Sequence, residues 1–174
     1  MEDINIKKAT LTDINQLQQI GRQTFLEAFS AGNAEEDMEK YLNDNFSIEK
    51  LTTELNNENS EFYLAELDNE VIGYLKLNFG PAQTELEQAN ALEIERIYVS
   101  KEFYGKKVGQ LLYQQAIQIA GKLNAKYVWL GVWEENSRAI RFYQKNGFIE
   151  FDKHIFKLGN DEQTDLMMKL ELNN

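Results

Sequence analysis

Two glycines mark the segment Phe103–Gly109, which lies between a predicted strand and the start of a predicted helix. Glycine lets the backbone curl so that free N–H groups at a helix N-terminus face an anion. The segment therefore predicts a binding site for a diphosphate group, although the same glycines also fit an ordinary tight turn. The dinucleotide fingerprint GxGxxG and the phosphate-loop pattern GxxxxGK(S/T) are absent, so neither of these nucleotide-binding classes is indicated.

Cysteine and histidine offer little further chemistry. The chain has no cysteine, which excludes a disulfide framework, a thiolate nucleophile and a Cys-ligated metal. The single histidine, His154, has no acidic or histidine partner at ligand spacing, so we expect it to be structural and we expect no metal site. A cysteine-free chain also fits a reducing cytosol, and we expect a cytoplasmic protein.

The elements around the glycine segment alternate between β and α patterns. A strand, a helix and a second strand between Leu92 and Val132 predict a parallel pair with a right-handed crossover, while the other strands look antiparallel. A polar loop, Gln83–Asn90, precedes them, and Thr12 and Asp13 are expected to cap the first helix. We expect strands at Ile4–Ala9, Phe62–Leu67, Val71–Leu77, Leu92–Val99, Tyr127–Val132, Phe148–Phe156 and Leu166–Leu172, and helices at 14–29, 35–42, 48–55, 107–123 and from Asn136 or Ser137 to Asn146.

In this order of elements the sequence resembles the GNAT superfamily of N-acetyltransferases. The matching residues are Leu92–Val99, the glycine segment, Trp129–Val132, Asn136 and, most specifically, Ala139–Phe148. Within the superfamily the sequence is similar to the bacterial PaiA-like spermidine/spermine acetyltransferases, at Gln23–Leu26, Leu92–Tyr98, Trp129–Glu134 and Glu162–Leu166. The resemblance implies one N-acetyltransferase domain over residues 1–174, of class α/β (α+β), in which helices flank a mixed central sheet of about seven strands.

The resemblance also implies an acetyl-CoA site in a cleft where the parallel strands splay apart. The pantetheine arm would pair with the backbone of Ile97, Tyr98 and Val99, and Asn136 would bond the same arm or only cap its helix. Lys145 would reach a CoA phosphate or simply be solvated. The pyrophosphate would lie on the N–H groups of Tyr104, Gly105, Lys106, Lys107, Val108, Gly109 and Gln110.

The glycine segment departs from the family pattern Gln/Arg-x-x-Gly-x-Gly. Tyr104 replaces the polar first residue, and Lys107 replaces the first glycine of the pattern. Backbone N–H donors survive both changes, and Lys106 or Lys107 would add positive charge at a phosphate. Close approach of the backbone at Lys107 becomes the point to test, with weakened or altered CoA binding as the consequence.

Acetyl transfer needs a neutral amine, a polarised carbonyl and a proton for the leaving thiolate. We expect Glu95 to be the base, acting through water with a raised pKa, with Glu93 in reserve; alternatively, Glu95 only pairs with Arg96 or a neighbouring strand. The resemblance makes Tyr143 the general acid toward the CoA sulfur; its alternative role is a packed aromatic. A strand N–H near Ile97 would stabilise the oxyanion.

The formal net charge of −11 argues against nucleic-acid binding and suits a cationic acceptor. We expect a small amine, preferably a polyamine, whose remote ammonium would bind the acidic cluster Glu35–Glu39 if that cluster borders the cleft. No apolar run approaches the roughly 18–20 residues that span a bilayer, so we expect no membrane association. A homodimer is compatible with the sequence. The alternatives are acetylation of protein N-termini or lysines, and a non-catalytic acyl-CoA-binding regulatory protein.

Overall fold

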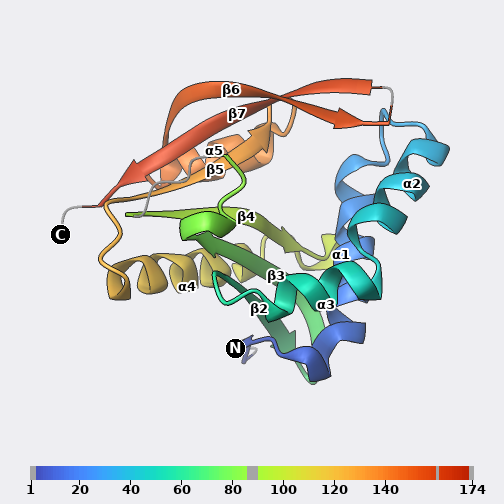
Figure 1. The fold of residues 1–174 in the computed structure, drawn as a ribbon, viewed down its shortest axis with the longest axis horizontal. Coiled ribbons are helices and arrows are strands. Elements are labelled where there is room, and N and C mark those ends of the chain that lie inside the picture. Colours follow the sequence, from blue (N-terminus) through green and yellow to red (C-terminus); the bar gives the residue numbers. More distant parts are fainter. Residues whose placement is uncertain (1–2, 86–89, 160, 173–174) are drawn as a thin grey trace.

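The computed structural model describes residues 3–85, 90–159 and 161–172. Its seven strands form one mixed sheet in the order β1-β2-β3-β4-β5-β7-β6 (Figure 1). Only β4 and β5 pair in parallel, as the sequence predicted. The strands are β1 Asn5–Lys8, β2 Ser60–Leu67, β3 Glu70–Phe79, β4 Ala91–Val99, β5 Tyr127–Trp133, β6 Ile149–Leu158 and β7 Asp161–Glu171.

Helices cover both faces of the sheet (Figure 1). The first three pack with β2 and β3 around a core that includes Leu51, Phe62 and Tyr74. The other two helices pack on a second core, in which the ring centres of Tyr113 and Phe142 lie 5.8 Å apart in an edge-to-face arrangement. These helices are α1 Ile14–Phe29, α2 Glu35–Asn45, α3 Ile48–Asn56, α4 Val108–Lys122 and α5 Ser137–Lys145.

Two of the differences from the sequence expectations have a clear physical cause. Asp13 is the N-cap residue of α1, as predicted, but makes no side-chain capping bond there, and Thr12 is not a cap. Instead, the Thr10 hydroxyl and the Asp13 side chain accept hydrogen bonds from each other's backbone N–H in a capping box around the short 3₁₀ turn that leads into α1. The last strand begins at Asp161, five residues earlier than expected, because Asp161 already pairs with Leu158 across the β6–β7 hairpin. Residues 86–89 of the expected polar loop lie outside the described part of the chain.

The parallel strands separate soon after they meet. Only Ala91, Leu92 and Glu93 of β4 have partners on β5, and the last partner is Trp129. From Ile94 onward β4 stays paired with β3 alone. The edge of β4 that faces β5 is therefore open from Ile94 to Val99, and this opening positions the site described next.

A bulge in β4 lies at the start of this opening. Lys76 of β3 pairs with Arg96, whereas the next residue of β3, Leu77, pairs with Ile94, so Glu95 is the extra residue. Without a bulge, Glu95 and Arg96 would point to opposite faces of the sheet. With it, both side chains contact Glu54 or Lys76 on the face that α1 to α3 cover.

Among the described residues no helix combines the length and the apolar content needed to cross a membrane.

Candidate functional site

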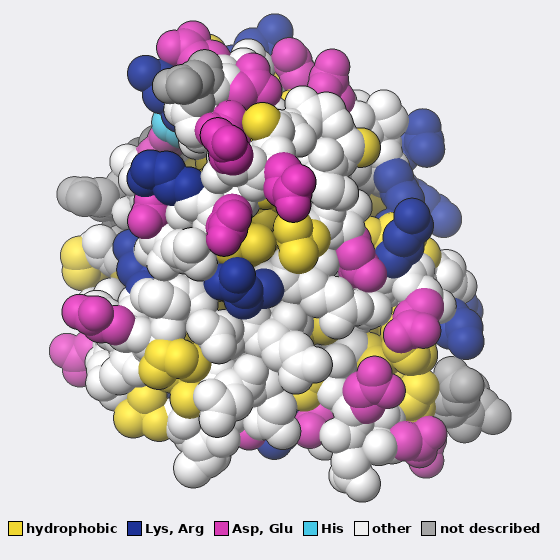
Figure 2. All heavy atoms as spheres, turned by 90° about the vertical axis from the view of Figure 1, so that its right-hand side faces the viewer, with side chains coloured by type: hydrophobic (Ala, Val, Ile, Leu, Met, Phe, Trp, Pro, Cys, Tyr) yellow, Lys and Arg dark blue, Asp and Glu magenta, His cyan; other side chains and the backbone are white. Residues whose placement is uncertain are grey.

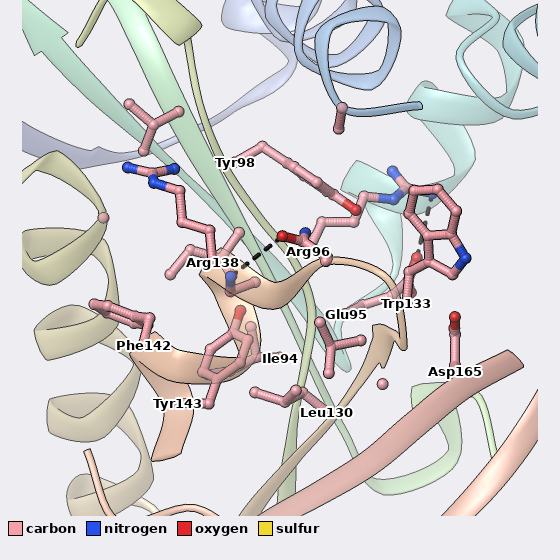
Figure 3. A pocket seen from close by; sticks show the side chains of 18 of the residues that line it. Ile94, Glu95, Arg96, Tyr98, Leu130, Trp133, Arg138, Phe142, Tyr143 and Asp165 are labelled. Atoms are coloured by element: carbon pink, nitrogen blue, oxygen red, sulfur yellow. Dashed lines mark hydrogen bonds and ion pairs between the residues drawn. The ribbon is translucent and has the colours of Figure 1, made fainter. Parts of the chain in front are cut away.

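A cavity of about 1520 Å³ opens where β4 and β5 separate. Its walls come from α1, α2, α4, α5 and the last two strands, so residues far apart in the sequence meet there (Figure 3). All but one of the predicted site residues line it. They are Glu95, Ile97, Tyr98, Val99, Tyr104, Gly105, Lys107, Val108, Gly109, Gln110, Asn136, Tyr143 and Lys145.

Lys106 is the exception among the predicted site residues. It is exposed, and its Nζ lies 5.5 Å from the centre of the Phe103 ring, where cation and ring attract each other. Lys107 lines the cavity instead, so it is the lysine of this segment that lies closer to a ligand in the cavity.

The glycine segment forms the expected turn, but the helix starts one residue later than predicted. Gly105 and Lys107 both adopt left-handed backbone conformations, with φ of 79° and 66°. Lys107 is the N-cap of α4, and its carbonyl accepts the first helical bond, from Leu111. The N–H groups of Val108, Gly109 and Gln110 therefore have no acceptor within the helix, and all three residues line the cavity, where these donors suit an anionic group.

The open edge of β4 supplies a second binding element. Gly73, Tyr74 and Leu75 of β3 take one edge of β4 opposite Val99, Tyr98 and Ile97. The other edge has unpaired backbone groups, and an extended ligand with amide groups can bond to them as an added strand does. The open edge and the α4 N-terminus together fit a long ligand that has amides along its arm and a diphosphate at its end.

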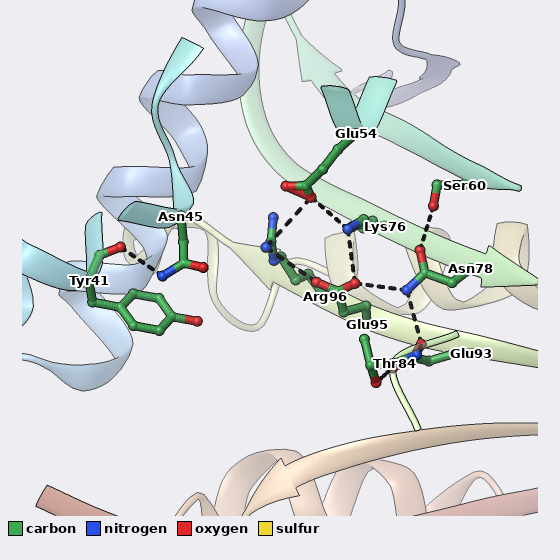
Figure 4. Close-up of polar contacts among 10 residues, drawn as sticks. All are labelled: Tyr41, Asn45, Glu54, Ser60, Lys76, Asn78, Thr84, Glu93, Glu95 and Arg96. Atoms are coloured by element: carbon green, nitrogen blue, oxygen red, sulfur yellow. Dashed lines mark hydrogen bonds and ion pairs between the residues drawn. The ribbon is translucent and has the colours of Figure 1, made fainter. Parts of the chain in front are cut away.

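Glu95 is the centre of a polar network across β3, β4 and α3 (Figure 4). Lys76 Nζ donates to Glu95 Oε1 at 2.9 Å and to Glu54 Oε2 at 2.6 Å, and Asn78 Nδ2 donates to Glu95 at 2.7 Å. Arg96 Nη2 lies 3.2 Å from the other Glu95 oxygen. Glu95 thus pairs with both Arg96 and a neighbouring strand, which was the alternative reading of the sequence.

The pKa of Glu95 moves in the direction opposite to our expectation. Burial alone would raise it, but Arg96, Lys76 and the hydrogen bond from Asn78 outweigh burial and lower the pKa to about 2. The expected raised pKa is therefore wrong. The bulge explains the error, because it turns Arg96 onto the same face as Glu95 and so adds a cation that simple strand alternation excludes.

Glu93, the reserve candidate, has the raised pKa that Glu95 lacks. Burial is the main cause, and hydrogen bonds from Asn78 and Thr84 offset only part of it. Its side chain is tied down, because Asn78 Nδ2 and the Thr84 N–H donate to Oε1 and the Thr84 hydroxyl donates to Oε2 at 2.6 Å. Glu93 is 3% exposed, so it is held in the wall of the cavity.

On the opposite wall, Tyr143 of α5 is buried at 6% exposure and its hydroxyl points into the cavity (Figure 3). Burial raises its pKa, with Tyr113 adding to the shift, so it is protonated at neutral pH and can give a proton. Asn136 caps α5, because its side chain accepts from the Ala139 N–H at 3.2 Å. Lys145 is exposed at the rim.

Three further side chains at the other end of the cavity were not among the predicted site residues. Asp165 on β7 lies directly across from Trp133 on β5 and from His154 on β6, and residues opposite each other in antiparallel strands share a face. His154 Nδ1 lies 2.5 Å from Glu85, so the histidine expected to be structural is on the cavity wall. Cross-strand partners are not visible in local sequence, although the resemblance at Glu162–Leu166 was a signal for Asp165.

The acidic cluster that the sequence suggested as a binding surface lies outside the cavity. The acidic cluster Glu35–Glu39 does not line it; Glu35, Glu36 and Glu39 are exposed, so the cluster does not border the cleft. By contrast, Trp129 is a core residue that also lines the cavity, and its indole N–H donates to Gln83 at 2.7 Å. Among the residues that the structure describes, no group of three His, Asp or Glu is arranged to hold a metal ion.

Comparison with protein families gives a match to most of the chain. The model described as the acetyltransferase (GNAT) family matches residues 18–148, which include most of α1, all of α2 to α5 and the strands from β2 to β5. The matched span covers both strands of the open pair and every predicted site residue.

Individual relatives agree with the family match. An uncharacterised N-acetyltransferase of Lactobacillus delbrueckii subsp. lactis is 38% identical over 172 residues, which cover 99% of each chain. The spermidine N(1)-acetyltransferase of Thermoplasma acidophilum is 30% identical over 149 residues, 83% of this chain and 88% of that protein. The crystal structure of the PaiA N-acetyltransferase of Thermoplasma acidophilum in complex with coenzyme A has a TM-score of 0.81, 28% identity, and covers 98% of this chain and 99% of its own.

Proposed function

The chain belongs to the acetyltransferase (GNAT) family and is an acetyl-CoA-dependent N-acetyltransferase, and from that premise we propose that its acceptor is a polyamine such as spermidine or spermine. The observation that carries the proposal is the composition of the end of the cavity where Trp133 and Asp165 lie, which we call the acceptor end. Aromatic rings from α1, α2, β5 and β6 line it together with carboxylates. Such a wall suits an aliphatic chain that carries ammonium groups.

Two further facts support a polycationic acceptor. The 30% identical relative from Thermoplasma acidophilum is a spermidine N(1)-acetyltransferase. The chain has a formal net charge of −11, and on the face shown in Figure 2 carboxylate side chains, with some Lys or Arg side chains among them, lie around a central patch of apolar side chains. A negative field of this kind raises the local concentration of cations and speeds their association.

The glycine segment and β4 bind the acyl donor in this proposal. Bound acetyl-CoA supplies a thioester, at whose carbonyl carbon the C–N bond forms as the C–S bond breaks. The N–H groups of Val108, Gly109 and Gln110 hold the diphosphate, and Ile97 to Val99 align the arm. A β4 N–H near Ile97 or Tyr98 stabilises the developing oxyanion.

Proton movement falls to Tyr143 and Glu95. The Tyr143 hydroxyl gives its proton to the leaving sulfur and takes one back, through water, from the nitrogen that has formed the new C–N bond. Glu95 accepts a hydrogen bond from the water that removes the ammonium proton, and its low pKa keeps it ionised throughout the physiological range. It therefore orients and polarises this water, and the proton passes on to solvent.

The cytosolic location is part of the same proposal, since the chain has no cysteine.

The test is a free-thiol assay with acetyl-CoA and a panel of polyamines, amino acids and peptides. We expect turnover with spermidine and spermine at kcat/KM at least tenfold above that with any peptide. A preference for peptides would instead assign the chain to protein acetylation. Binding of acetyl-CoA by calorimetry without turnover on any amine would indicate a regulatory acyl-CoA-binding protein.

A further inference from the structure

One carboxylate of the cavity wall, Asp165, is partly buried and makes no side-chain hydrogen bond or ion pair with the residues that the structure describes. Glu95 is paired with Lys76 and Arg96, and Glu93 is held by Asn78 and Thr84. Asp165 has no Lys, Arg or His within salt-bridge distance among the residues that the structure describes.

The remaining carboxylates of the wall are also occupied or exposed. Glu27 accepts from the Lys101 N–H at 3.0 Å, and Glu85 is in contact with His154. Glu135 is exposed at the rim. Asp165 is therefore the partly buried negative charge that is left for a ligand.

The position of Asp165 follows from strand register. Its cross-strand partners are Trp133 on β5 and His154 on β6, so all three side chains lie on the cavity face of the sheet. The carboxylate leans over Gly131, where an added Cβ would meet Asp165 Oδ2 at 3.5 Å. Figure 3 shows Asp165 and Trp133 together at one end of the cavity, away from Tyr143.

Burial removes part of the hydration of the Asp165 carboxylate, and this favours the binding of a cation beside it. Burial raises the pKa of Asp165 to about 6, His154 lowers it somewhat and Glu85 raises it further. A bound ammonium group would restore the favourable interactions that the carboxylate loses on leaving water. At neutral pH the carboxylate is ionised and ready to bind one.

Aromatic rings surround the same position. Phe29 lies 5.6 Å from Trp133 between ring centres, and Phe29 and Tyr41 lie 6.4 and 5.9 Å from Phe156. These rings belong to α1, α2, β5 and β6, and all of them line the cavity. Ring faces attract ammonium groups and also pack on methylene chains, so they match both parts of a polyamine.

We propose that Asp165 binds the non-reacting ammonium group of the acceptor and so selects amines that carry a second positive charge. Asp165 then determines specificity and takes no part in bond making, since the acid Tyr143 lies at the other end of the cavity in Figure 3. This role rests on the proposed function, because it presupposes a polycationic acceptor that reacts near Glu95 and Tyr143.

The experiment measures kcat and KM for spermidine and for n-butylamine with the full chain at saturating acetyl-CoA. Asp165→Asn keeps the size of the side chain and removes the charge. We expect the KM for spermidine to rise about 10- to 100-fold, as for the loss of a charge-assisted hydrogen bond, with kcat within about threefold. The kcat/KM for n-butylamine should stay within about twofold. Glu162→Gln is the matched control, because this carboxylate lies on the same strand, is 64% exposed and does not line the cavity.

The possible outcomes separate this inference from the proposed function. An unchanged KM for spermidine in Asp165→Asn overturns the role of Asp165 alone. An equal fall of kcat on both amines also overturns it and indicates proton transfer instead. A wild-type chain that acetylates no polyamine overturns the proposed function and this role with it. A diamine series on the wild-type chain gives a check that needs no variant: the KM should fall sharply when a second ammonium is added.

Discussion

The Lys76 ammonium lies between the carboxylates of Glu54 and Glu95, at 2.6 and 2.9 Å. With Arg96 the four groups carry two positive and two negative charges, and all are largely buried. A buried ion network of this kind fixes the bulged part of β4, because each charge needs its partners to offset lost hydration. The part of the cavity wall formed by Glu95 and Arg96 therefore belongs to a buried polar network that carries no net charge.

Removing one charge from this network should destabilise the folded protein. Glu95→Gln leaves the two cations Lys76 and Arg96 to share one carboxylate, Glu54, and we expect it to lower the free energy of unfolding at pH 7 by about 3 kcal/mol. Urea denaturation measures this directly. Glu39→Gln, an exposed change in the middle of α2, should stay within about 0.5 kcal/mol.

The pH dependence of stability checks the same network. The pKa of Glu95 is lowered from 4.5 to about 2, so its stabilisation is complete above about pH 4.5 and is lost as the pH falls toward 2. Glu95→Gln should flatten the stability curve in this window relative to the wild type. Parallel curves for the two proteins between pH 4.5 and 2 would show that Glu95 is not in the ion network.

Tyr143→Phe removes the proposed proton donor and keeps the ring. We expect kcat to fall about 100-fold, a typical contribution of general acid catalysis, while the affinity for acetyl-CoA measured by calorimetry stays within about twofold. Tyr113→Phe is the control, since Tyr113 is equally buried at 6% exposure but does not line the cavity. If both variants lose the same activity, packing of the aromatic cluster explains the loss.

Lys107 adopts a left-handed conformation that favours glycine, with φ of 66°. Lys107→Gly should therefore raise the free energy of unfolding by about 1 kcal/mol, whereas Lys107→Ala should leave it nearly unchanged. Because backbone N–H groups hold the diphosphate, the KM for acetyl-CoA should change less than about threefold in both. A tenfold rise in KM in both variants would instead assign the binding to the lysine charge.

Asp165→Asn should stabilise the free protein. The pKa of Asp165 is raised from 3.8 to about 6, so the folded state holds this proton more tightly and the ionised group destabilises the fold above about pH 6. After screening by solvent we expect a gain of about 1 kcal/mol at pH 7.5 that vanishes below pH 3.8. Thermal unfolding of both proteins at pH 7.5 and below pH 3.8 measures this gain in stability. A variant less stable than the wild type at pH 7.5 would contradict the account.

Local sequence patterns predicted the donor side of the cavity. The β4–α4–β5 unit and the motif Ala139–Phe148 depend on residue spacing within single elements, and the expected parallel pair is present. The splayed cleft, which the family resemblance implied, is present as well. The start of α4 was misplaced by one residue because Lys107 occupies a conformation that its residue type does not suggest. A homodimer remains a prediction.

The acceptor side depends on relations between elements, which the sequence does not display. The lowered pKa of Glu95 results from one extra residue in β4 and from Lys76, a neighbour on another strand. Asp165 reaches the cavity only because the register of β5, β6 and β7 places it opposite Trp133 and His154. Register and bulges are set by packing of whole strands, so spacing within one strand cannot predict them.

The most direct test of polyamine acetylation follows an isotope label from acetyl-CoA. The purified chain is incubated with labelled acetyl-CoA and spermidine, and the products are separated and identified by mass spectrometry. We predict that the label appears on a spermidine nitrogen in an amount equal to the free thiol released. Label found only in acetate, or thiol released at the same rate with and without spermidine, would contradict the claim.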